Sequence, residues 1–174
     1  MKKSTLVKIA TAGLFAALAT LTFTIENLFP PIILPGARMG LSNVFILLSA
    51  ILLGGIYGYS TLVIKILLGS LFAGNISSIM YSLPAGILSF TIELLFILYA
   101  KKTSLISISV VGAVINTTVQ NLAFCLFAGA KEYLVYLPYL SAISVISGLI
   151  VGLTVYLILR RLPHKAVKDK FVED

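Results

Sequence analysis

The sequence predicts an all-α membrane protein, a bundle of six transmembrane helices with a Pro-rich cap between helices 1 and 2. Only 11% of the 174 residues are charged and 59% are hydrophobic, whereas a soluble domain carries about 25% charged residues. The mean hydropathy is +1.09. Charged and Gly/Pro-rich points divide the chain into apolar runs, and a membrane span needs about 20 residues. The runs cover approximately 5–25, 41–55, 57–73, 78–100, 104–129 and 133–159. We expect one transmembrane domain at 1–162 and a polar cytoplasmic tail at 163–174.

The first run carries small residues at helical spacing. Ala12, Ala16 and Thr20 fall on one face of a helix. Faces of this kind let helix backbones approach closely in a membrane. The face therefore serves either an internal contact with another helix of the chain or the docking of a second membrane subunit.

A proline-rich segment separates the first run from the second. Pro30, Pro35 and Gly36 exclude a regular helix there. The segment is still apolar, so we expect it to fold back as a cap over the outer mouth of the bundle. Glu26 and Arg38 bracket the cap. Three roles fit these charges: a pair that holds the cap shut, attraction of an anionic substrate by Arg38, or simple anchoring at the interface.

The second and third runs are short and meet at a glycine cluster. Gly54, Gly55 and Gly58 fall within five residues, and glycine disfavours helix continuation. The cluster predicts a tight turn between two short helices. One long helix through this region is the competing interpretation.

Two charged side chains lie deep inside the third and fourth runs. A charge at the centre of a bilayer costs roughly 2.5–3.5 kcal/mol on insertion scales, so it is usually kept for a partner or a ligand. Lys65 and Glu93 fall at similar depths on helices that neighbour each other in sequence. They either form a structural pair, or Lys65 contacts a substrate or an ion.

The fifth run contains a second group of polar residues. Asn116 and Gln120 are four residues apart and share one face of a helix, as do Thr117 and Asn121. Carboxamides near the middle of the membrane offer donors and acceptors without net charge. This suits a polar ligand, but hydrogen bonding between helices is an equally ordinary use.

The distribution of basic residues predicts the orientation. With six spans both termini share one side, and that side is strongly basic. It carries Lys2, Lys3, Lys8, Lys101, Lys102, Arg160, Arg161, Lys165, Lys168 and Lys170, against Arg38 and Lys131 opposite. The positive-inside rule then predicts a multi-pass protein of the cell membrane with both termini in the cytoplasm. The net charge of +7 is explained by topology, and we expect no nucleic-acid partner.

The sequence lacks the signatures of an enzyme. Its aspartates are Asp169 and Asp174, in the tail together with His164. A magnesium-dependent diphosphate enzyme needs several carboxylates that converge on the metal. No phosphate-binding Walker loop is present. We therefore expect no metal site, no cofactor and no catalysis by this chain.

Three stretches together carry a family resemblance: Pro35–Asn43, Lys65–Gly74 and Tyr81–Ser89. Each is glycine-rich and apolar, and their order and spacing resemble a small bacterial membrane family. That family is known as heptaprenyl diphosphate synthase component I, or as the Gx transporter family. The resemblance extends from Glu26 to about Leu153. The family in turn is similar to the substrate-binding S components of energy-coupling factor transporters.

The resemblance implies roles for individual residues. S components have six helices, and the first docks on a coupling subunit through an Ala-xxx-Ala face, which Ala12 and Ala16 match. Family positions are also matched by Glu26, Arg38, Asn43, Lys65 and Gln120.

The chain departs from the family pattern at three positions. Asn116 and Thr117 stand where a His-Asn pair is expected, and Glu93 stands where the family is apolar. These differences leave the substrate open.

We therefore expect an S-component-like subunit for uptake of a small vitamin, prenyl or quinone precursor. It would work with a transmembrane coupling subunit and cytosolic ATPases. The expected substrate-binding residues are Arg38, Asn43, Lys65, Glu93, Asn116, Gln120 and Asn121, and the expected gate is Glu26, Pro30, Pro35 and Gly36. The alternatives are a non-catalytic accessory component of a polyprenyl diphosphate synthase and a purely structural membrane protein.

Overall fold

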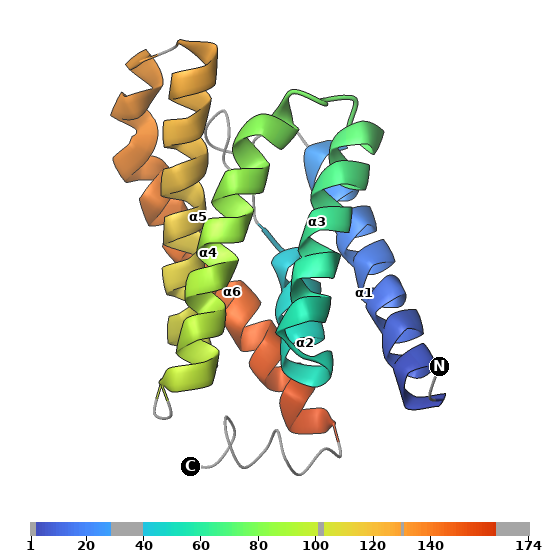
Figure 1. Ribbon diagram of the computed structural model, residues 1–174. Helices are drawn as coiled ribbons and strands as arrows, with labels where there is room; N and C mark the ends of the chain where they lie inside the picture. The colour runs from blue at the N-terminus through green and yellow to red at the C-terminus, as the bar shows by residue number, and fades with distance from the viewer. Residues whose placement is uncertain (1–2, 29–39, 101–102, 130, 163–174) are drawn as a thin grey trace.

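The computed structural model describes residues 3–28, 40–100, 103–129 and 131–162. Within these residues the chain forms six α-helices and one short 3-10 helix, η1 (Figure 1). They are α1 (Lys3–Leu28), α2 (Asn43–Leu53), α3 (Gly55–Phe72), α4 (Ser78–Tyr99), α5 (Leu105–Ala128), η1 (Lys131–Tyr136) and α6 (Leu137–Arg161). The predicted tail and the predicted cap residues Pro30, Pro35, Gly36 and Arg38 lie outside the described residues.

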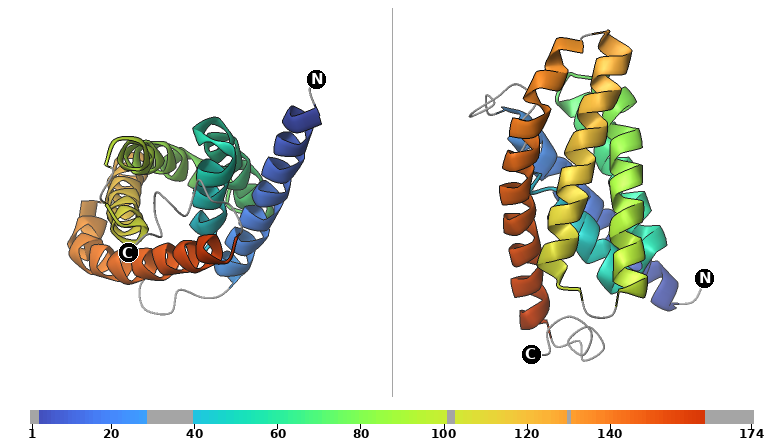
Figure 2. Two further views of the ribbon diagram at one scale, coloured as in Figure 1. Left: turned by 90° about the horizontal axis from the view of Figure 1, so that it is seen from below. Right: turned by 90° about the vertical axis from the view of Figure 1, so that its left-hand side faces the viewer.

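Five of the helices form a closed ring. α3 packs on α4, α4 on α5, α5 on α6, α6 on α2, and α2 on α3. α1 lies outside this ring and packs against α2 and α3, as the view along the bundle in Figure 2 shows. We use "inner end" for the end of the bundle where α4 ends and α5 begins, and "outer end" for the end where α3 ends and α4 begins.

The predicted all-α membrane fold is confirmed, but one helix is shorter than a span. Five helical segments of the described chain are long and apolar enough to cross a membrane, and α2 is a shorter apolar helix of 11 residues. At 1.5 Å per residue α2 is about 16 Å long, against a hydrocarbon core of about 30 Å. α2 occupies only the inner half of the ring, so the outer half lacks a helix at the position between α6 and α3 (Figure 1).

The predicted turn between the second and third runs is also confirmed. Gly54 separates α2 from α3. Its φ is 117°, a backbone conformation that residues other than glycine rarely adopt. The break is confined to this residue, and Gly58 lies inside α3. A Cβ at Gly58 would come within 2.4 Å of the Phe90 ring. This second glycine therefore serves close packing between α3 and α4.

The inner end of the bundle is a packed apolar core. Its buried side chains come from α2, α4, α5 and α6: Val44, Leu47, Leu48, Ile97, Leu105, Ile108, Val151, Val155 and Leu159. α6 approaches α5 closely here, since a Cβ at Gly152 would lie 2.7 Å from the Ile106 Cα. Small residues at helix contacts are the usual means of close packing in membranes.

The small-residue face of α1 is buried within the chain itself. Ala12, Ala16, Ala19 and Thr20 are all buried, on a helix that packs against α2 and α3. The structure thus places this face in the internal contact that the sequence left open. Docking of a partner on Ala12 and Ala16 would require α1 to separate from the bundle.

Candidate functional site

The outer half of the ring surrounds a partly open cavity of about 350 Å³. Helices α1 to α6 and η1 all contribute to its walls. The structure brings together every predicted substrate-binding residue that it describes, with the predicted gate residue Glu26. These are Glu26, Asn43, Lys65, Glu93, Asn116, Gln120 and Asn121. Arg38 lies outside the described residues. That these residues bind a substrate stays a prediction.

Lys65 lies in the cavity wall next to the start of α2. Its Nζ donates a hydrogen bond to Asn43 Oδ1 over 2.8 Å and lies 5.4 Å from the centre of the Phe23 ring. Lys65 is only 6% exposed. Because a lysine ammonium can only donate, this bond fixes the Asn43 oxygen toward Lys65 and leaves the amide donors on the other side.

The turn that precedes α2 holds a carboxylate. Glu26 Oε1 accepts a hydrogen bond from the Leu41 backbone N–H over 2.5 Å. Gly40 has a φ of 63°, and a Cβ there would lie 3.3 Å from both Asn43 Nδ2 and Ser147 Oγ. The glycine allows the chain to turn into α2 at the wall of the cavity. α2 therefore begins inside the bundle and not at its surface.

Glu93 lies on the α4–α5 side of the cavity. A Cβ on Gly112 would overlap the Glu93 carboxylate, so the missing side chain of Gly112 makes the space for it. Lys65 and Glu93 line the same cavity, while the hydrogen bond of Lys65 given above goes to Asn43. The Lys65–Glu93 pair stays a prediction.

The predicted polar face of α5 lies on the cavity wall. Asn116, Thr117, Gln120 and Asn121 all line the cavity. The Ser89 hydroxyl makes a long 3.5 Å contact to Asn116 Oδ1 and also donates to the Gly86 carbonyl oxygen. Asn116 therefore combines a contact to α4 with a place on the cavity wall. That the face binds a ligand stays a prediction.

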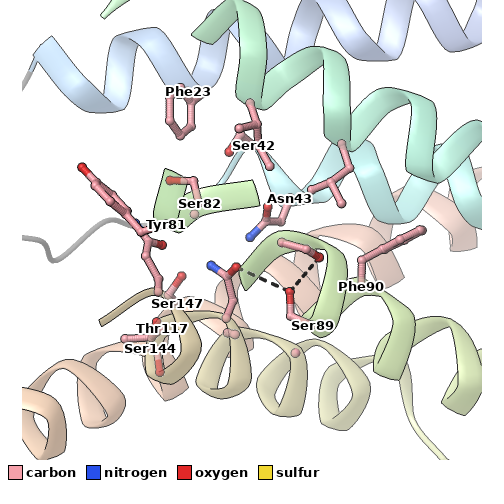
Figure 3. A pocket seen from close by; sticks show the side chains of 18 of the residues that line it. Phe23, Ser42, Asn43, Tyr81, Ser82, Ser89, Phe90, Thr117, Ser144 and Ser147 are labelled. Carbon is pink, nitrogen blue, oxygen red and sulfur yellow. Dashed lines mark hydrogen bonds between the residues drawn. The ribbon is translucent and has the colours of Figure 1, made fainter. Parts of the chain in front are cut away.

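Sequence reasoning missed the serines of the cavity. Figure 3 shows Ser42, Ser82, Ser89, Ser144 and Ser147 around the cavity, from α4, α6 and the residue before α2. Ser82 and Ser89 are seven residues apart, and Ser144 and Ser147 three apart, so each pair shares a helix face. This spacing within apolar runs was the signal that could have found them.

Aromatic side chains line the outer part of the cavity. Tyr81 and Phe124 make an edge-to-face contact with ring centres 5.5 Å apart, and Phe124 makes another with Tyr133 at 5.2 Å. All three residues line the cavity. Tyr81 lies near the outer end of α4, and its ring is therefore part of the outer wall of the site.

The arrangement offers binding chemistry. It combines an ammonium, two carboxyl groups, several carboxamides, hydroxyls and aromatic rings around one cavity. Among the residues that the structure describes, no three His, Cys, Asp or Glu side chains come together as metal ligands.

Comparison with known families gives one match. The family model described as heptaprenyl diphosphate synthase component I matches residues 15–158. The chain belongs to this family. Comparisons with curated proteins and with solved structures gave no significant match.

The match to the heptaprenyl diphosphate synthase component I family includes the whole candidate site. The matched range begins within α1 and ends within α6. Every described residue that lines the cavity falls inside it. The resemblance to this family inferred from three glycine-rich stretches is confirmed.

Proposed function

We propose that this protein is the substrate-binding membrane subunit of an uptake transporter, similar to the S components of energy-coupling factor transporters. The observation that carries the proposal is the partly open cavity between membrane-spanning helices, with charged and polar side chains in its wall. Its substrate would be a small vitamin, prenyl or quinone precursor.

The lining of the cavity supports a binding role. Polar groups removed from water are costly unless they are hydrogen-bonded, yet this bundle gathers charged and polar side chains around one space. A volume of about 350 Å³ lies at the lower end of the range of about 300–1,000 Å³ that is typical of small-molecule sites. It therefore suits a compact polar molecule better than a complete heptaprenyl chain.

The start of α2 adds support from the architecture. In many transporters the substrate binds near the middle of the membrane, where a discontinuous helix ends inside the bundle. Here α2 begins at the cavity, and Ser42 and Asn43 lie on its wall.

Transport would require partners that supply energy. We propose a transmembrane coupling subunit and cytosolic ATPases, with the inner end of the bundle facing the cytoplasm. The basic pair Arg160 and Arg161 at the end of α6 supports this orientation under the positive-inside rule.

Uptake measurements test this proposal. Radiolabelled candidate precursors are offered to cells that contain or lack the coupling module, with wild type, Lys65→Ala and the exposed-site control Lys131→Ala. We expect uptake to require the module and to be lost in Lys65→Ala but kept in Lys131→Ala. Uptake that is the same without the module would exclude the coupling role, and uptake unaffected by Lys65→Ala would exclude the site.

The family description favours a second candidate function, an accessory component of a polyprenyl diphosphate synthase. In that case the chain would bind a soluble synthase at the membrane and raise its activity. Co-purification with the synthase and a rise in its rate upon addition of this protein would support the accessory role. Failure of both would exclude it.

A further inference from the structure

Two buried hydroxyl groups at the cavity have no hydrogen-bond partner among the described residues. They are Ser42 Oγ and Ser82 Oγ, on side chains that are 1% and 7% exposed. A buried polar atom without a partner loses its hydration free energy and gains nothing in return. Such groups in a binding cavity point to a ligand that supplies the missing partner.

Ser42 is unusual for a residue at its position. It is the N-cap of α2, where a serine oxygen normally accepts a hydrogen bond from the first turn. Here its φ of −57° and ψ of −23° are helical, and the side chain makes no capping bond. Figure 3 shows Ser42 and Ser82 among the side chains that line the cavity. The Ser42 hydroxyl thus makes no bond to its own helix, although the residue lines the cavity.

Other donors lie at the same wall. The Lys65 ammonium binds Asn43 Oδ1, so the Asn43 amide nitrogen presents donors near Gly40. The amides of Asn43 and Val44 already bond to the turn before α2. Side chains therefore supply the donors, while the helix dipole of α2 adds partial positive charge.

Two carboxyl groups on the cavity wall oppose an anion when they are ionised. Glu26 is held by the Leu41 amide, and Glu93 lies against Gly112 on the α4–α5 side. Neither carboxylate can donate a hydrogen bond while it is ionised. Of the two, Glu26 lies at the turn before α2, so an anion beside Ser42 and Asn43 needs the Lys65 ammonium to offset this carboxylate.

We propose that the start of α2, with Ser42, Asn43, Lys65 and Ser82, is a subsite for the anionic group, a carboxylate or a phosphate, of a small ligand. The inference rests on the proposed function, because it assigns a chemical class to the molecule that the cavity binds. The anion accepts hydrogen bonds from the two serine hydroxyls and is balanced by the Lys65 ammonium. The aromatic side chains of the outer cavity face the remainder of the ligand.

Matched aromatic probes test the subsite. Benzoate, phenyl phosphate, benzamide and benzylamine are titrated against the purified protein in lipid nanodiscs, with binding read by saturation-transfer NMR. We expect benzoate or phenyl phosphate to bind roughly tenfold more tightly than benzamide, because charge-assisted hydrogen bonds are the stronger ones. The better of the two anions identifies the carboxylate or the phosphate as the natural group.

Serine variants locate the effect. Ser42→Ala and Ser82→Ala should each weaken the preferred anion roughly three- to tenfold and leave benzamide unchanged. Ser82→Thr keeps the hydroxyl and should keep the preference. Ser60→Ala is the control, because that exposed hydroxyl on α3 bonds to its own helix at Ile56.

The subsite is wrong if neither anion binds, if benzamide or benzylamine binds as well as the anions, or if the anion preference survives Ser42→Ala and Ser82→Ala together. A neutral or cationic molecule that co-purifies in the cavity would overturn this subsite while it supports the proposed function. Binding of the anionic probes without any transport would support the subsite and count against the proposed function. The two failures can thus be told apart.

Discussion

The inner and outer halves of this bundle use the same long helices in opposite ways. At the inner end, side chains such as Leu47, Ile108 and Val155 fill the ring with a dry apolar core. At the outer end the same ring surrounds a cavity lined with hydroxyls, carboxamides and charges. α2 makes the difference, because it is about half as long as a span and fills only the inner half.

The contrast explains how a small membrane protein can hold polar groups without loss of its fold. Close helix contacts at the inner end stabilise the bundle, and the cavity at the outer end can be devoted to binding. Two pairs of buried hydroxyl groups differ in their hydrogen bonding. Ser49 and Thr61, both fully buried between α2 and α3, bond to each other, whereas Ser42 and Ser82 at the cavity lack partners within the described chain.

The largest expected effect comes from a bulky residue in the inner contact between α5 and α6. In Gly152→Leu the new side chain would overlap the α5 backbone at Ile106. We expect a loss of at least about 3 kcal/mol in the free energy of unfolding, read as failure to purify as a monodisperse protein. Gly13→Leu is the control, since no atom lies within 4 Å of its added Cβ. Equal behaviour of the two variants would contradict the packed inner contact.

The same substitution in the two halves should have unequal costs. Leu47→Ala removes a side chain from the inner core and should cost about 2–5 kcal/mol in the free energy of unfolding. Leu140→Ala removes an equally buried side chain that borders the cavity. Its cost should be smaller, because some of its packing partners are already missing. Thermal unfolding in detergent gives the comparison, and an equal or greater loss at Leu140 would count against the hollow outer half.

Replacement of Lys65 should separate binding from stability. Lys65→Met keeps the length of the side chain and removes a buried charge together with its hydrogen bond to Asn43. We expect the free energy of unfolding to fall by about 1–3 kcal/mol, because the Asn43 oxygen loses its donor. We also expect the affinity for an anionic ligand to fall by at least roughly tenfold. Calorimetry and ligand titration on one preparation measure both. Large destabilisation with unchanged affinity would make Lys65 a structural residue.

The smallest effect concerns single hydroxyl groups. Ser49→Ala removes a satisfied hydrogen bond to Thr61 and should cost about 0.6 kcal/mol, the average for such bonds in a membrane bundle. Ser82→Ala removes a hydroxyl without a partner in the described chain and should be neutral or stabilising. Both values come from reversible unfolding in mixed micelles. A greater loss for Ser82→Ala would mean that its hydroxyl stabilises the fold.

Most of the fold could be predicted from the sequence, because lipid imposes a simple rule on it. Runs of apolar residues long enough to span the bilayer became helices, and Gly54 ended α2 where the glycine cluster predicted a turn. That α2 spans only about half of the membrane was harder to predict. Its run appeared as about 41–55, and only the structure shows that it starts inside the ring.

Site residues could be predicted where placing the side chain in lipid costs much free energy, and less well where that cost is small. Lys65, Glu93 and the amides of α5 stood out against an apolar background, and all of them line the cavity. Serines did not, because a serine within a membrane helix often bonds to its own backbone, as Ser144 does to the Ser141 carbonyl oxygen. The face of Ala12 and Ala16 shows a different limit. Sequence spacing identified a close contact but could not tell an internal neighbour from a partner.

The central claim is that the outer cavity binds a small molecule. Mass spectrometry of the protein purified from bacterial membranes tests it most directly, with Thr117→Phe to fill the cavity and Val111→Phe on the exposed side of α5 as control. We predict that one small molecule co-purifies in a fixed ratio with wild type and with Val111→Phe, and is absent from Thr117→Phe. A molecule retained equally by Thr117→Phe, or none in any preparation, would contradict the account.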